Sequence, residues 1–142
     1  MNFLFITQSW RSWTGHAFEC ICLKHIEGIK AELGLAAVQT AASKWKYTPP
    51  RGSKEQGCQI DFIIDRADSC INLCETELYS NEFVIDKEYA ASLRYKKECF
   101  DRITNTKKST FTTLLCASGV KHNDHFVSTV DQEVTISALF LK

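Results

Sequence analysis

Apolar and polar positions along the chain follow two different periods, and the changes between them predict the elements. Between residues 14 and 34 apolar side chains recur every three or four positions, the period of an amphipathic helix. These side chains are Phe18, Ile21, Cys22, Ile26, Ile29 and Leu33, with His25 on the same stripe. Thr14 is a suitable N-cap and Gly34 a suitable C-terminal residue for this helix.

A second helical stripe begins at Ile85, with Asp86 where a carboxylate stabilises a helix N-terminus. Its apolar positions are Tyr89, Leu93, Phe100 and Ile103. Lys96 falls on this stripe, an unusual position for a charged side chain. We therefore expect a helix whose core-facing side carries one ammonium group.

Short runs of strand-forming residues predict the rest of the fold. Residues 35–47, 58–66 and 70–78 read as strands, with a loop at 48–57 and a turn at 67–69 that makes the last two an antiparallel hairpin. After the second helix, residues 109–119 predict a fourth strand and residues 124–130 a fifth. Residues 135–140 predict a short closing helix or turn.

This order predicts an α/β fold in which one mixed central sheet is flanked by helices, in the order α-β-β-β-α-β. A chain of 142 residues is long enough for one hydrophobic core and short for two. We expect a single domain over residues 1–142, with residues 1–12 as a candidate remnant of a preceding segment.

Charge and cysteine content narrow the class of protein. Lysine and arginine number 17, as do aspartate and glutamate, a balance that argues against a polybasic nucleic-acid arm and leaves room for a locally basic groove. No apolar run approaches the roughly 20 residues of a membrane span, and the N-terminus lacks the pattern of a signal peptide. The seven cysteines include no C-x-x-C pair, so we expect buried, reduced thiols in a cytoplasmic protein.

Acidic residues converge on the predicted hairpin. The period of two places Asp61 on one side of its strand, and Glu75 and Glu77 share a side of the next. Pairing through the 67–69 turn would bring Asp61 opposite Glu75, where two carboxylates repel unless a cation offsets them. Mg²⁺ is such a cation, because it accepts one or two carboxylates together with waters and phosphate. The alternative is that both acids are simply exposed at strand ends.

A helix glutamate (Glu19), a strand aspartate (Asp61) and a glutamate on the next strand (Glu75) resemble the signature of the PD-(D/E)XK nuclease superfamily, in which the last acid begins a Glu-x-Lys motif. Longer stretches are similar to the nuclease-like C-terminal domain of bacterial AAA-type ATPases, over about residues 10–140. These stretches are "SWTGHAFECICLKHIEGIKAELG", "GCQIDFIIDRADSCINLCE", "FVIDKEYAASLRYKKECF" and "TKKSTFTTLLCASGVKHN". The resemblance implies a restriction-endonuclease-like core.

The resemblance also implies roles for individual residues. Glu19, Asp61 and Glu75 would hold Mg²⁺ or Mn²⁺, with Asp61, Glu75 and position 77 forming the catalytic motif. The ion would activate a water and stabilise charge on the phosphate. The family pattern has lysine at position 77, where this chain has Glu77.

Two lysines of the second predicted helix, Lys96 and Lys87, are candidate substitutes for the missing lysine. The alternative for Lys96 is that its aliphatic stem lies along the core while its ammonium reaches water.

The resemblance therefore leaves two principal hypotheses. One is a Mg²⁺-dependent phosphodiester hydrolase acting on DNA, impaired by Glu77. The other is a catalytically inactive module of the same fold that binds nucleic acid or a separate ATPase partner, since the chain has no G-x-x-x-x-G-K-[ST] loop of its own. A remnant of a truncated gene without activity is a third interpretation. The oligomeric state is not indicated by the sequence.

Overall fold

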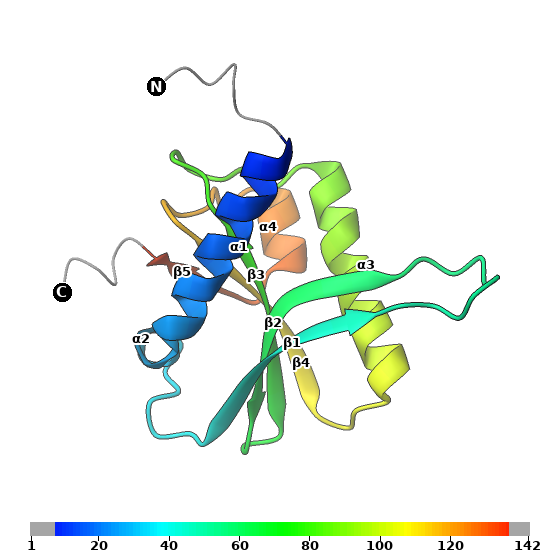
Figure 1. The fold of residues 1–142 in the computed structure, drawn as a ribbon. Helices are drawn as coiled ribbons and strands as arrows, with labels where there is room; N and C mark the ends of the chain where they lie inside the picture. Colours follow the sequence, from blue (N-terminus) through cyan, green and yellow to red (C-terminus); the bar gives the residue numbers. More distant parts are fainter. Residues whose placement is uncertain (1–7, 137–142) are drawn as a thin grey trace.

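The computed structural model describes residues 8–136, with side chains from residue 15 onward. Four helices and five strands follow one another in this part of the chain (Figure 1). In chain order they are α1 (Gln8–Lys24), α2 (Ile26–Glu32), β1 (Thr40–Tyr47), β2 (Cys58–Arg66), β3 (Cys70–Glu77), α3 (Lys87–Thr104), β4 (Ser109–Cys116), α4 (Asp124–Thr129) and β5 (Gln132–Thr135).

The strands form one mixed sheet in the order β1-β2-β3-β4-β5. The β1–β2 and β2–β3 pairs are antiparallel, whereas β3–β4 and β4–β5 are parallel. Strands β1 and β2 are joined by the ten-residue loop 48–57 and β2 and β3 by the three-residue turn 67–69, whereas each parallel pair is joined through a helix. The predicted α/β fold with a mixed sheet flanked by helices is therefore confirmed.

Helices α1 and α2 cover one face of the sheet, because their apolar stripe matches the inward residues of the strands. Phe18 and Cys22 of α1 and Ile29 of α2 pack on Phe62 of β2 and Leu115 of β4. All five side chains are at most 6% exposed. This core holds α1 against the middle of the sheet and so fixes where Glu19, one residue after Phe18, lies.

Helices α3 and α4 cover the opposite face. Leu93 of α3 packs on Leu114 of β4, and Phe100, one turn from the helix end, packs on Leu73 of β3. Asp86, predicted to lie near the helix N-terminus, caps α3, which begins at Lys87, two residues after the predicted start: its carboxylate accepts a hydrogen bond of 2.7 Å from the Tyr89 backbone N–H. The cap and the two core clusters set the rotation of α3, and thereby the position of Lys96.

A β-bulge interrupts the pairing of β1 with β2. Ser43 pairs with Ile63 but Trp45 pairs with Ile60, so the two residues 61 and 62 oppose one residue of β1. As a result Ile60 packs on the α3 side together with Ile63, although the simple alternation of a strand would separate them. The bulge falls on Asp61 and changes the direction of the strand there.

Four predicted elements differ from the structure. The first helix begins at Gln8 rather than near Thr14, so Thr14 lies inside α1 and is no N-cap, and it breaks at His25 into two helices. Gly34 follows α2 with a φ of +76°, as its predicted role requires. The first predicted strand starts at Thr40, five residues later than expected.

The largest error concerns residues 124–130, which form helix α4 and not a strand. The Asn123 side chain accepts a hydrogen bond of 2.9 Å from the Phe126 N–H and so starts a helix over β-branched residues that favour a strand. The fifth strand is instead β5 (Gln132–Thr135), which overlaps the predicted closing helix or turn only at Thr135. Residues 137–140 of that prediction lie outside the described part.

All seven cysteines are free. Four of them, Cys22, Cys74, Cys99 and Cys116, are buried as predicted, and the others are half-buried. Within residues 8–136 no helix combines the length and apolar character that a membrane crossing needs.

Candidate functional site

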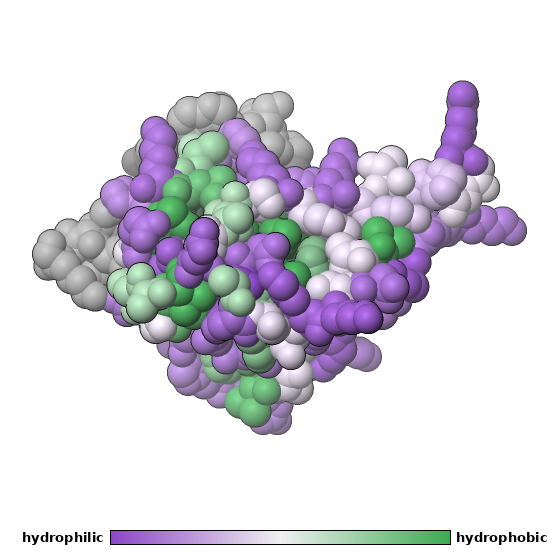
Figure 2. Space-filling model, turned by 90° about the horizontal axis from the view of Figure 1, so that it is seen from below, coloured by the Kyte–Doolittle hydropathy of each residue, from purple (hydrophilic) through white to green (hydrophobic). Residues whose placement is uncertain are grey.

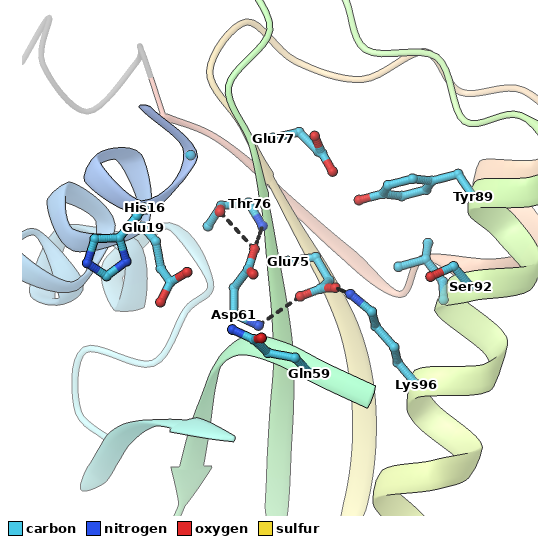
Figure 3. A pocket seen from close by; sticks show the side chains of 12 residues that line it. His16, Glu19, Gln59, Asp61, Glu75, Thr76, Glu77, Tyr89, Ser92 and Lys96 are labelled. Carbon is cyan, nitrogen blue, oxygen red and sulfur yellow. Dashed lines mark hydrogen bonds and ion pairs between the residues drawn. The ribbon is translucent and has the colours of Figure 1, made fainter. Parts of the chain in front are cut away.

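A cavity of about 480 Å³ opens at the carboxyl end of β3, between α1 and α3 (Figure 3). Helix α1 contributes one wall, α3 the opposite wall, and the ends of β2 and β3 form the floor. The lining residues are Gly15, His16, Glu19, Gln59, Asp61, Glu75, Thr76, Glu77, Tyr89, Ser92, Leu93 and Lys96. Four carboxyl groups and one ammonium group therefore share this space.

Asp61 lies at the centre of the cavity floor, on the bulge of β2. Its Oδ2 accepts hydrogen bonds from the Thr76 N–H, at 2.8 Å, and from the Thr76 hydroxyl, at 2.9 Å. The Asp61 N–H in turn donates to Glu75 Oε2 at 2.9 Å. These three bonds fix both acids at the ends of their strands, and the predicted approach of Asp61 to Glu75 is confirmed.

Glu75 is the most constrained acid of the site, with 5% of the residue exposed. Its second carboxylate oxygen, Oε1, accepts from the Lys96 ammonium of α3. Burial, and after it the negative charge of Asp61, raises the pKa of Glu75 to about 7, while Lys96 lowers it. Glu75 is thus an acid that can change protonation near neutral pH.

Glu19 faces the same cavity from α1 and is 6% exposed. Its Oε1 lies 3.2 Å from the ammonium of Lys44, on strand β1. This buried oxygen makes no hydrogen bond with the described residues, so the ion pair is its partner. Lys44 itself keeps half of its side chain in solvent.

Glu77 occupies the end of β3 and points toward Tyr89 of α3 (Figure 3). Burial raises the pKa of the Glu77 carboxyl, and the nearby Tyr89 hydroxyl opposes this shift. Burial, followed by the charge of Glu77, also raises the pKa of Tyr89, which keeps the phenol protonated. Glu77 therefore belongs to a Glu–Tyr pair on the α3 side of the cavity.

The structure brings together the predicted acids Glu19, Asp61, Glu75 and Glu77. Of the two candidate lysines, Lys96 enters the cavity and pairs with Glu75. The alternative, in which the Lys96 ammonium reaches only water, is therefore wrong. Lys87 is exposed at the start of α3 and is not among the lining residues.

Sequence reasoning missed the residues that position these acids. Thr76 holds Asp61, Tyr89 meets Glu77, and Lys44 meets Glu19. Thr76 could have been predicted from the sequence, because its hydroxyl lies between Glu75 and Glu77 at the acidic end of the strand. No local pattern identifies Lys44 or Tyr89, because their contacts depend on how β1 and α3 pack.

The oxygen donors of the cavity suit a hard divalent cation. Among the described residues no three His, Cys, Asp or Glu side chains are grouped closely enough to hold a metal by themselves. Mg²⁺ does not require such a group, because it keeps several waters and binds through one or two carboxylates. Asp61 has one carboxylate oxygen, Oδ1, without a hydrogen bond to the described residues, and the buried Glu19 Oε1 is held only by a lysine.

Comparison of the chain with protein-family models, with curated proteins and with solved structures found no match.

Proposed function

We propose that this chain is a PD-(D/E)XK-type domain that hydrolyses phosphodiester bonds of DNA with Mg²⁺ or Mn²⁺. The observation that carries the proposal is the convergence of Glu19, Asp61 and Glu75 with the ammonium of Lys96 in one cavity. A restriction-endonuclease-like core and a cytoplasmic location are parts of the same proposal. The run of α1, three antiparallel strands, α3 and the parallel strand β4 supports that core.

Asp61 and Glu19 are the side chains placed to hold the cation, with Glu75 beside them. When bound, the ion supplies Lewis-acid stabilisation of the phosphate and lowers the pKa of a coordinated water. Asp61 is suited to this because Thr76 fixes one of its carboxylate oxygens and leaves the other available. A carboxylate held in this way presents its free oxygen without losing further side-chain entropy.

Lys96 supplies the positive charge that the family motif takes from position 77. It reaches Glu75 from α3 instead of from two residues along the same strand. Glu75 in turn keeps the ammonium inside the cavity, where it can stabilise negative charge on a phosphate oxygen. With the lysine function on α3, Glu77 is left to pair with Tyr89.

One observation favours the second candidate function, a catalytically inactive module that binds nucleic acid or an ATPase partner. Lys96 and Lys44 already neutralise Glu75 and Glu19 within the protein. If these ion pairs persist, the acids serve to hold α1, β1 and α3 around the sheet and do not bind a cation.

The test is a cleavage assay on plasmid DNA with Mg²⁺ or Mn²⁺, combined with metal titration by calorimetry. Asp61→Asn should abolish both cleavage and metal binding, because it replaces the central carboxylate with an amide. Lys96→Met should lower the cleavage rate by about 10²- to 10³-fold, the usual loss when one group that stabilises charge in the transition state is removed.

The matched control is Asp65→Asn on the same strand, an exposed acid outside the cavity that pairs with Lys108. It should cleave and bind metal like the wild type. Absence of metal binding by the wild type would refute the metal-site proposal. Cleavage that appears only in Glu77→Lys would instead show that the module has lost its activity through this one position.

A further inference from the structure

The connection between β1 and β2 projects from the body of the molecule. In Figure 1 this hairpin extends past α3, and in Figure 2 its outer end, at the right of the view, carries mainly hydrophilic side chains. We call the segment 44–57 the arm. Its four basic residues are Lys44, Lys46, Arg51 and Lys54, all exposed, and its one acidic residue is Glu55.

The negative charge of the arm is already neutralised. Glu55 Oε1 lies 2.5 Å from Arg102 Nη2 of α3, and Glu55 Oε2 accepts from the Tyr47 hydroxyl at 2.9 Å. These contacts lower the pKa of Glu55, with the bond from Tyr47 first, so it stays an anion paired to its neighbours. Lys46, Arg51 and Lys54 therefore have no acidic partner among the described residues, whereas Lys44 is paired with Glu19 on α1.

The arm is also held in place and does not depend on a ligand for its shape. The Tyr95 hydroxyl of α3 donates to the backbone oxygen of Gln56. Gly57 lies so close to the end of β1 that an added Cβ would be 2.8 Å from the backbone oxygen of Tyr47. A surface that is ordered before binding does not lose loop entropy when it binds.

The basic residues lead directly to the cavity. Lys44 contacts Glu19 on its wall, and Lys46 pairs across the ladder with Gln59, a lining residue. Lys44 and Lys46 share one side of β1. The intervening Trp45 turns to the other side and packs on Phe100, with ring centroids 5.0 Å apart.

We propose that the arm binds the sugar–phosphate backbone of duplex DNA and delivers it to the cavity. This inference rests on the proposed function, because it names how that site meets its substrate. The seven steps from Lys44 to Arg51 would span at most about 23 Å if fully extended at about 3.3 Å per residue. This length corresponds to several phosphates, because one DNA strand carries a phosphate about every 3.4 Å of helix axis. Trp45 packs on Phe100 and the Tyr47 hydroxyl is bound to Glu55, so the arm offers charge rather than a base-stacking platform and binds without regard to sequence.

The distribution of charge fits a polyanion that is cut by metal-assisted chemistry. A cavity with four carboxyl groups and one ammonium repels phosphate before a cation is bound. A basic arm beside it retains the DNA while the acidic cavity keeps its affinity for the cation.

The test measures the anisotropy of a fluorescent duplex of about 20 base pairs in EDTA, over about 50–200 mM salt. Without divalent cation no cleavage occurs, so binding is measured independently of the proposed hydrolysis. Arg51→Ala/Lys54→Ala should weaken binding and reduce the slope of log affinity against log salt by about two, because each basic side chain neutralises about one phosphate. Lys24→Ala/Lys121→Ala is the control, since it removes the same charge from exposed positions outside the arm.

An unchanged slope in the arm variant, an equal loss in the control, or no DNA binding by the wild type would each overturn the proposal. Equal competition by polyglutamate at matched charge would also overturn it, because the arm would then be a site for acidic protein. Binding that follows these expectations without any Mg²⁺-dependent cleavage would leave the arm established and refute the hydrolase alone.

Discussion

Glu75 receives hydrogen bonds at both carboxylate oxygens, from the Asp61 N–H and from Lys96, and still has a raised pKa. Burial disfavours its charge more than these partners favour it, and the carboxylate of Asp61 adds repulsion. The residue is therefore balanced between a neutral acid and an ion-paired carboxylate near neutral pH. A bound cation would shift this balance toward the carboxylate.

This balance predicts how stability depends on pH in the metal-free protein. Glu75 has a pKa of about 7 in the folded state against an ordinary value of 4.5, so the folded state binds more protons between these limits. The free energy of unfolding should fall as pH rises from about 4.5 to about 7, by on the order of 1–3 kcal/mol from this residue, and level off above. Urea denaturation across this pH range measures the effect.

Glu75→Gln should flatten that dependence, because an amide does not titrate. Asp65→Asn, exposed on the neighbouring strand, should leave it unchanged. A Glu75→Gln protein that keeps the full slope would assign the titration to another group; Glu77 is the first candidate, since burial raises its pKa as well.

At the scale of single residues, the acids of the site could be predicted from the sequence, but the residues that hold them in place could not. The hairpin period placed Asp61 against Glu75 because strand alternation and a three-residue turn fix the register locally. The bulge on Asp61 was not predictable from alternation, because it depends on how Ser43 and Trp45 pair with the neighbouring strand. The contacts of Tyr89 with Glu77 and of Lys44 with Glu19 were not predictable either, because they depend on how α3 and β1 pack against the rest of the fold.

At the scale of the element, α3 determines whether the site is complete. It carries Lys96 and Tyr89 into the cavity, and it anchors the arm through Tyr95 and Arg102. Its first turn depends on the Asp86 cap. The stability of one helix N-terminus therefore affects both the cavity wall and the support of the arm.

Asp86→Ala should lower the free energy of unfolding by about 0.5–2 kcal/mol, because the Tyr89 N–H loses its acceptor at the helix start. Asp86→Asn is the matched control, since an asparagine oxygen accepts the same bond and should preserve most of the stability. Chemical denaturation of the two variants makes the comparison. Equal losses in both would show that the charge of Asp86 is what stabilises α3.

Element prediction succeeded where periodicity was long and failed where a single side chain decides. The eighteen residues of α3 show the helical period directly. In contrast, the six residues of α4 depend on the Asn123 cap, and β-branched Val127 and Thr129 point to a strand when read alone. The parallel partner of β4 was misplaced for the same reason.

At the scale of the whole molecule, formal neutrality conceals a separation of charge. Four acidic residues gather in the cavity, and the arm carries four basic residues against one acidic residue. Total charge argued against a basic nucleic-acid arm, and only the fold showed that basic residues form one projecting hairpin. Because four acids repel one another in the cavity, we expect a bound cation to increase the stability of the whole folded molecule.

Mg²⁺ that binds the folded cavity, and not the unfolded chain, should raise the melting temperature. At a concentration of 100 times its dissociation constant the gain is about 2.7 kcal/mol, and each 1 kcal/mol corresponds to about 2–4 °C for a chain near this size. Thermal scans with MgCl₂ against NaCl of equal ionic strength measure the shift. Asp61→Asn should remove it, and an equal shift in this variant would place the cation elsewhere.

The reactivity of the buried cysteines measures how often the core opens to solvent. Burial raises the pKa of Cys22 and of Cys116 to about 12, so almost no reactive thiolate forms while the sheet is closed. Cys22 packs between α1 and the sheet, and Cys116 packs on the α3 side. The alkylation rate of Cys22 therefore reports how often the α1 side of the sheet opens, and that of Cys116 how often the α3 side opens. These two sides carry the two walls of the cavity.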